Sequence, residues 1–73
     1  MSQNITTVIL ERTPTELFKI LKFEGLASSG AEAKLVIANG LVKVNGEIET
    51  QKRKKIIAGN VIEYDNNILK ISD

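Results

Sequence analysis

The chain has 73 residues, ten of them lysine or arginine and nine aspartate or glutamate, so its formal net charge is only +1. It contains no cysteine and no histidine, which excludes disulfides, thiolate chemistry and the commonest soft metal ligands. This length allows one domain with a small core, and a hydrophobic content of 42% is too high for a disordered chain.

The sequence gives no sign of a membrane or secreted protein. No apolar stretch approaches the roughly 18 residues that a membrane-spanning helix needs. Residues 1–16 lack the charged start, the long apolar run and the cleavage site of a secretion signal. We therefore expect a cytoplasmic protein that does not act at a membrane.

The first predicted elements are a short strand and a helix. β-Branched residues dominate residues 6–10, which predicts a strand or an extended arm. Residues 13–16 (TPTE) have the form of a capping box with proline at the first helical position, so a helix is expected over residues 14–24. Three apolar residues of this helix recur at helical spacing and are expected to form a buried stripe: Leu17, Ile20 and Leu21. Phe18 lies beside this stripe.

A second helix is predicted close behind the first. Ser29 and Glu32 form another Ser-x-x-Glu pair, and Asn39-Gly40 is typical of a helix end. The two helices are expected to form a short hairpin, because only about four residues join them. The predicted apolar face of the second helix consists of Ala31, Leu35 and Ala38, with Val36 and Ile37 alongside.

After Gly40 the pattern changes to alternation, which predicts strands. The two valines of residues 42–44 are expected to point one way and Lys43 the other. Asn45-Gly46 is the strongest short signal for a β-hairpin, since both positions of such a turn need positive φ. Further strands are expected over residues 47–49, 55–57, 61–64 and 68–71. The predicted fold class is α+β: a two-helix hairpin packed on a small, mostly antiparallel, bent sheet.

The residues offer little for catalysis. No histidine stands ready as a base for a serine or threonine nucleophile, and the acidic residues are scattered singly. Their spacing matches neither a catalytic dyad nor a metal cage, and no glycine-rich phosphate loop is present. We therefore predict a protein that is not an enzyme and that needs no cofactor or metal.

Positive charge is concentrated in one part of the chain. Residues 34–55 carry six cations and two acids, whereas the rest carries four cations and seven acids. Four of the cations are consecutive, at residues 52–55 (KRKK). Such a run is typical of a solvated edge strand, but it also suits a polyanion, which relieves the repulsion and releases counterions as it binds.

Other residues in this region combine a structural role with a candidate binding role. Ser29 caps a helix whose N-terminal amides and positive dipole end suit a phosphate, and Lys34 lies about one turn further on. Lys43 is first of all an exposed strand residue. Asn45 and Gly46 are first of all a turn, although an exposed asparagine also suits a ribose or a base.

Taken in chain order, these features resemble the RNA-binding domain first named for the small-subunit ribosomal protein S-four, also called the alpha-L motif. The resemblance covers about residues 17–64, and residues 25–47 (GLASSGAEAKLVIANGLVKVNGE) are its most specific part. It is closest to the free-standing, single-domain bacterial members of the family. The residues that carry it are Leu17, Leu21, Gly25, Leu26, Ala27, Ser28, Ser29, Glu32, Ala33, Ile37, Gly40, Val42, Val44, Asn45, Gly46, Gly59 and Ile62.

The resemblance implies a single RNA-binding domain over residues 1–73, with the second helix and the hairpin after it as the RNA face. The expected partner is structured RNA, with ribosomal and transfer RNA both open, bound through phosphate and shape. Carried over by position, the RNA-binding residues are Ser28, Ser29, Gly30, Glu32, Lys34, Lys43, Asn45, Gly46, Lys52, Arg53, Lys54 and Lys55. Many members have arginine where this chain has Gly30, so the phosphate contact of that arginine is not carried over, and we expect Lys34 and residues 52–55 to supply the charge instead.

Two alternatives stay open at the level of sequence. A protein-interaction module would use the basic run to dock an acidic partner, for example on a ribosome. An antitoxin-like or assembly protein would exchange its first strand between chains and form a stable dimer, whereas we expect a monomer. No aromatic residue lies between Gly25 and Asn60, so base stacking is expected to contribute little.

Overall fold

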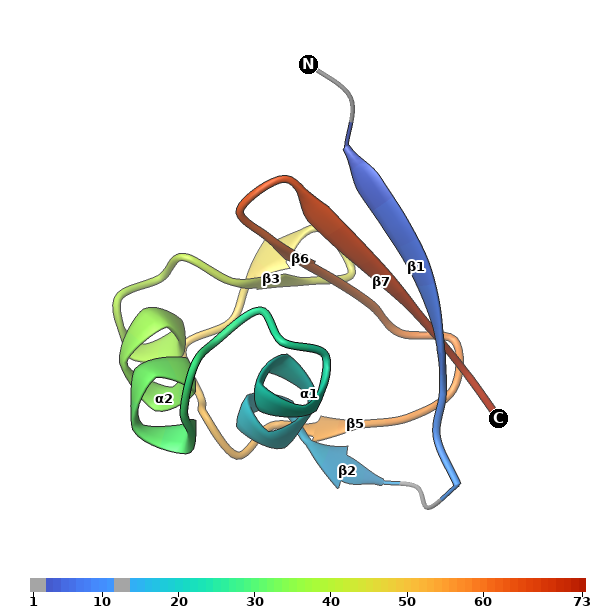
Figure 1. The fold of residues 1–73 in the computed structure, drawn as a ribbon, viewed down its shortest axis with the longest axis horizontal. Helices are drawn as coiled ribbons and strands as arrows, with labels where there is room; N and C mark the ends of the chain where they lie inside the picture. The colour runs from blue at the N-terminus through green and yellow to red at the C-terminus, as the bar shows by residue number, and fades with distance from the viewer. Residues whose placement is uncertain (1–2, 12–13) are drawn as a thin grey trace.

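Within the residues that the structure describes, 3–11 and 14–73, two helices lie on one face of a five-stranded sheet (Figure 1). In this computed structural model the helices are α1 (Leu17–Phe23) and α2 (Gly30–Ala38). The strands of the sheet are β1 (Asn4–Ile9), β3 (Lys43–Val44), β4 (Glu47–Ile48), β6 (Val61–Tyr64) and β7 (Asn67–Ser72), in the spatial order β1-β7-β6-β3-β4. Two short strands, β2 (Thr15–Glu16) and β5 (Lys55–Ile56), form a separate antiparallel ribbon. The predicted helical hairpin on a mostly antiparallel sheet is confirmed.

The first strand lies at the edge of the sheet and runs parallel to the last. β1 pairs with β7 from Asn4 opposite Asn67 to Ile9 opposite Ser72. The other pairs of the sheet are antiparallel. Of the two predictions for residues 6–10, the strand is therefore correct, and it begins two residues earlier than expected. The pairing brings two segments that are far apart in the sequence side by side (Figure 1).

The prediction of a helix over residues 14–24 is wrong at its N-terminal end. Residues 15–16 are extended and pair with β5, so α1 begins at Leu17. Backbone pairing with a distant strand overrides the local Thr-x-x-Glu pattern. Glu16 occupies the N-cap position, and Thr13, the predicted cap, lies outside the described residues. The buried residues of α1 are the three that its spacing predicts: Leu17, Ile20 and Leu21.

Helix α2 begins and ends where the sequence predicts, but it buries a different face. The buried residues are Ala33, Val36 and Ile37. The predicted apolar face is exposed and consists of Ala31, Leu35 and Ala38. Residues 35–38 are apolar on all sides of the helix, so spacing alone does not select the buried side. Packing against α1 and the sheet selects it instead.

The hairpin between β3 and β4 follows its sequence pattern closely. The two valines of residues 42–44 are buried and Lys43 is exposed. Asn45 and Gly46 have φ of 54° and 84°, as the two-residue hairpin turn of the Asn-Gly type requires. Asn45 also holds β6: its amide donates to the Val61 carbonyl at 2.7 Å, and its Oδ1 accepts from the Val61 amide at 2.9 Å.

One hydrophobic core lies between the helices and the sheet. Its buried residues are Val8, Leu17, Ile20, Leu21, Ala27, Ala33, Val36, Ile37, Val42, Val44, Ile56, Ile62, Leu69 and Ile71. In the described part of the chain no polar or charged residue is buried, so the described ionisable groups lie at the surface. Neither of the two helices described is long and apolar enough to cross a membrane.

The two faces of α2 give a direct test of this packing. Ile37 is completely buried, whereas Leu35 on the same helix is 60% exposed. Ile37→Ala should therefore lower the free energy of unfolding by about 2–5 kcal/mol, through lost burial and the cavity left behind. Leu35→Ala is the matched control and should change it by less than about 0.5 kcal/mol. Urea denaturation of both variants measures this, and equal losses would contradict the observed orientation of the helix.

Candidate functional site

The basic run, residues 52–55, is held against the N-terminus of α1 by backbone hydrogen bonds. The Leu17 amide donates to the Lys54 carbonyl at 2.9 Å, and the Phe18 amide donates to the Lys52 carbonyl at 3.1 Å. These are the first amides of the helix, which have no partner inside it. The run therefore takes the place of a side-chain cap, which α1 lacks. Its cations are fixed beside the helix.

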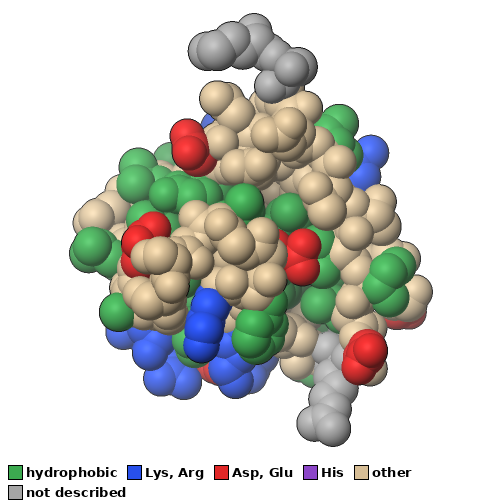
Figure 2. All heavy atoms as spheres, viewed as in Figure 1, with side chains coloured by type: hydrophobic (Ala, Val, Ile, Leu, Met, Phe, Trp, Pro, Cys, Tyr) green, Lys and Arg blue, Asp and Glu red, His purple; other side chains and the backbone are tan. Residues whose placement is uncertain are grey.

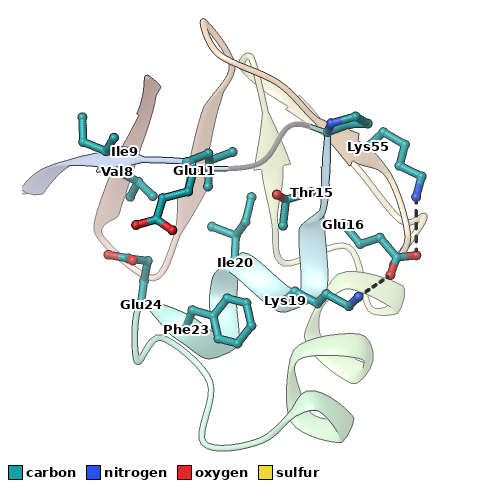
Figure 3. A pocket seen from close by; sticks show the side chains of 12 residues that line it. Val8, Ile9, Glu11, Thr15, Glu16, Lys19, Ile20, Phe23, Glu24 and Lys55 are labelled. Atoms are coloured by element: carbon teal, nitrogen blue, oxygen red, sulfur yellow. Dashed lines mark ion pairs between the residues drawn. The ribbon is translucent and has the colours of Figure 1, made fainter. Parts of the chain in front are cut away.

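One carboxylate joins three cations at this place. Glu16 Oε1 lies 3.3 Å from Lys19 Nζ, and Glu16 Oε2 lies 3.5 Å from Arg53 Nη1 and 3.9 Å from Lys55 Nζ. Figure 3 shows Lys19 and Lys55 reaching this carboxylate from opposite sides. The Glu16 side chain is only 14% exposed, whereas the side chains of its partners are between 49% and 63% exposed. The carboxylate is therefore the inner member of the group.

These contacts change the ionisation of Glu16. Burial by itself would raise the pKa of Glu16. The hydrogen bond from Lys19 and the positive charges of Lys19, Lys55 and Arg53 outweigh it, so the pKa lies below the ordinary value of 4.5. Glu16 is therefore charged at neutral pH, and it offsets the repulsion between the cations around it.

The Phe18 ring is a second point at which cations converge. Lys34 Nζ lies 4.6 Å from the ring centroid, Arg53 Cζ lies 5.8 Å from it and Lys19 Nζ lies 6.0 Å from it. These distances are within the range of cation–π attraction. The three cations come from α2, from the turn before β5 and from α1. Phe18 thus joins the start of the second helix to the basic run.

The start of α2 has the predicted cap. Ser29 Oγ accepts a hydrogen bond from the Glu32 amide at 3.1 Å, and Ser28 Oγ donates to the Glu32 carboxylate. This carboxylate is stabilised by the positive end of the helix dipole, but it would repel a phosphate. Gly30 lies beside Phe18, where a Cβ would meet the ring at 3.8 Å, an ordinary contact distance.

The hairpin residues of the predicted site lie apart from this cluster. Lys43 is exposed on a strand whose neighbouring valines enter the core, so it lies on the sheet face opposite the helices, next to Glu63 in β6. Asn45 uses its amide and its Oδ1 to hold β6, and Gly46 completes the turn. Among residues 3–11 and 14–73, no ion pair or cation–ring contact links Lys43 to the cluster.

On the surface around the cluster, basic and acidic side chains are distributed differently. Figure 2 shows lysine and arginine side chains gathered along one edge, below the two helices in this view, and the acids of the same face set apart from one another. An open groove of about 620 Å³ lies between α1, β2 and the end of β1. Lys55 lies at one end of this groove and Glu11 and Glu24 at the other (Figure 3). Both acidic and basic side chains line this groove. An anion is therefore better accommodated on the solvent-facing side of the cationic edge than inside the groove.

Sequence reasoning missed three residues of this site: Glu16, Phe18 and Lys19. It assigned Glu16 to a capping box and Phe18 to the flank of an apolar stripe, and it gave Lys19 no role. The pairing of Glu16 with Lys19 is local, at a spacing of three residues. The cations that complete the cluster come from residues 34–55, so no local pattern reveals the cluster as a whole. The charge of the basic run was a further signal, since four adjacent cations favour a nearby acid.

The arrangement suits binding of an anion. Amines and a guanidinium from several elements present their donors on one edge, and such groups bind phosphate or carboxylate oxygens. In the part of the chain that the structure describes, no group of three or more acidic side chains could hold a metal ion.

Comparison with known proteins places the chain in a family. The family model described as the S4 domain matches residues 8–72, nearly the whole chain. The chain therefore belongs to the S4 domain family, as its helix start, hairpin and glycine pattern predict.

Within this family the chain resembles one small protein in particular. It is 46% identical over 56 residues to "Putative RNA-binding protein YbcJ" of Escherichia coli (strain K12), covering 77% of this chain and 80% of that protein. The "Uncharacterized protein YbcJ" of Shigella flexneri matches this chain with the same identity and the same coverage. The solution structure of YbcJ from E. coli, described as revealing an αL motif involved in RNA binding, matches with a TM-score of 0.68 and 36% identity. This match covers 100% of this chain and 91% of that one, so the predicted likeness to free-standing members of the family is confirmed.

The lowered pKa of Glu16 predicts a pH-dependent contribution to stability. Because the pKa in the folded state lies below the ordinary 4.5, the contribution is present above 4.5 and is lost as the pH falls through the folded value. Acidification from about pH 7 to about pH 3 should therefore destabilise the native protein more than the Glu16→Gln variant. Urea denaturation at both pH values measures the difference. The control is Glu47→Gln, an exposed acid of β4, and a difference no larger than that of the control would contradict the role of Glu16.

Proposed function

We propose that this protein is a non-catalytic RNA-binding protein that docks structured RNA through its phosphates and its shape. The observation that carries the proposal is the convergence at the Phe18 ring of Lys34, from the start of α2, and Arg53, from the basic run. The family resemblance of the sequence predicts that these two regions belong to an RNA face. The fold brings them together on one cationic edge.

The physical chemistry of this edge favours an RNA backbone as the ligand. Cations that neutralise phosphates release condensed counterions, which gives most of the affinity of such contacts. Double-stranded RNA is recognised mainly through its phosphates, its 2′-hydroxyls and its shape. Phe18 is covered by cations rather than open to a base, so stacking is not expected to contribute.

The relatives support the same proposal. The E. coli relative carries the name of an RNA-binding protein, and the motif in its solution structure is described as involved in RNA binding. This chain shares 46% of the aligned residues with that relative and has the same fold over its whole length.

The finer parts of the proposal extend beyond this edge. We propose that the whole chain acts as one RNA-binding domain, as a monomer in the cytoplasm, on ribosomal or transfer RNA. The α2 start and the basic run form the main contact region, in which Glu32 shapes the turn rather than touching phosphate. Lys43, Asn45 and Gly46 form a second, separate contact region at the hairpin.

Salt dependence and a double substitution test the proposal together. If about four phosphates are neutralised, affinity for an RNA hairpin should fall roughly a hundredfold between about 50 and 200 mM salt. Lys52→Gln/Lys54→Gln should flatten the slope of log affinity against log salt by about two and weaken binding about tenfold at about 100 mM salt. Fluorescence anisotropy of a labelled RNA hairpin measures both quantities. These two lysines are chosen because neither takes part in the ion pairs of Glu16.

The matched control is Lys22→Gln/Lys70→Gln, which removes the same charge from the last turn of α1 and from β7. It should change affinity much less, and equal effects of the two pairs would contradict the proposed surface. An acidic protein is the alternative ligand of the same cations. Failure of any structured RNA to bind, combined with binding of a polyglutamate peptide that depends on Lys52 and Lys54, would favour that alternative.

A further inference from the structure

We propose that Lys19 is a further RNA-phosphate ligand, and that Phe18 and Glu16 position it with Lys34 and Arg53 as one phosphate site. This inference rests on the proposed function and deepens it. It adds to the RNA surface a residue of α1, an element outside the helix-and-hairpin face that the sequence predicts.

The first support is the shared geometry of the three cations. Lys19 and Arg53 both contact the Glu16 carboxylate, at 3.3 Å and 3.5 Å, and both lie within 6.0 Å of the Phe18 ring centroid. Lys34 lies over the same ring at 4.6 Å. The side chains reach this place from three elements that only the fold brings together. A ligand that contacts Arg53 and Lys34 therefore also comes within reach of Lys19.

The second support is the balance of charge. Three cations, Lys19, Arg53 and Lys55, contact one carboxylate, and Lys34 lies over the Phe18 ring, so positive charge remains that Glu16 does not neutralise. The carboxylate is the less exposed partner, since the side chains of its cations are between 49% and 63% exposed. Their remaining donors are therefore available on the solvent side. Glu16 lowers the repulsion between the cations while a phosphate binds them from outside.

The third support is the way in which the site is fixed. The backbone bonds from the first amides of α1 to the carbonyls of Lys52 and Lys54 hold the turn that carries Arg53 beside Lys19. The Phe18 ring then limits the positions of the cationic heads. Cations that are already gathered lose less conformational entropy when a phosphate binds, which raises affinity without a new contact.

The simpler interpretation of Lys19 is a surface ion pair with Glu16, three residues away on the same turn. Such exposed pairs contribute little to stability. This interpretation predicts that loss of Lys19 changes RNA affinity no more than loss of any other exposed lysine of α1. Lys22, in the last turn of the same helix, supplies that comparison.

The experiment measures binding of a labelled RNA hairpin by anisotropy, over a series of salt concentrations, for Lys19→Gln and Lys22→Gln. Lys19→Gln should weaken binding about threefold to tenfold at about 100 mM salt and flatten the log–log salt slope by about one. Lys22→Gln should leave both nearly unchanged. Lys19→Gln should flatten the salt slope by the same amount in a Glu16→Gln background. In that background Lys19 has no ion pair with Glu16, so the effect cannot come from loss of that pair.

The positioning role of Phe18 is tested with two substitutions at one site. Phe18→Tyr keeps an aromatic face for the cations and should bind RNA within about twofold of the native protein. Phe18→Leu keeps an apolar side chain but loses that face, and should weaken binding about threefold or more. Thermal unfolding checks that both variants fold, and equal affinities of two folded variants would overturn this role.

The outcomes separate this inference from the proposed function. If Lys19→Gln and Lys22→Gln have equal effects while Lys52→Gln/Lys54→Gln still weakens binding, Lys19 is not a ligand but the RNA surface stands. If the native protein binds no structured RNA at any salt concentration, both proposals fail.

Discussion

The structure depends on backbone hydrogen bonds that join residues 15–18 to residues 52–56. This contact ends β2, starts α1 and fixes the basic run, all through main-chain groups. Because the first amides of α1 find carbonyls in a distant turn, the helix needs no side-chain cap. A substitution of a side chain in the run therefore changes the charge of the surface without removing the bonds that place it.

The same contact creates an electrostatic problem that one residue relieves. The N-terminus of a helix carries partial positive charge, so four cations placed beside it repel both one another and the helix. Glu16 at the N-cap position is close to the helix end and to three cations at once. The acid stabilises the free protein while leaving the cations exposed. Stability and ligand binding therefore draw on one group of charges.

The sequence predicts the parts of this fold whose causes are local. The Ser29 cap needs only its own turn, and Asn45-Gly46 needs only the conformations of two residues. The start of α1 is mispredicted because it is set by the pairing of β2 with β5. The buried face of α2 is mispredicted because residues 35–38 are apolar on all sides of the helix. The candidate site divides in the same way. The α2 start and the basic run are visible as motifs, whereas Glu16 and Phe18 join the site through contacts with residues far along the chain, and Lys19 joins it through Glu16 and Phe18.

The parallel pairing of β1 with β7 bears on how the chain folds. Contacts between segments so distant in sequence raise the contact order, and closing such long loops slows folding in small domains. Of the described strands, β1 is translated first and its partner β7 last. Its uncharged edge, residues 4–9, must therefore remain unpaired while the helices and the β3–β4 hairpin form. At that stage the unpaired N–H and C=O groups of this strand are open to pairing with another chain.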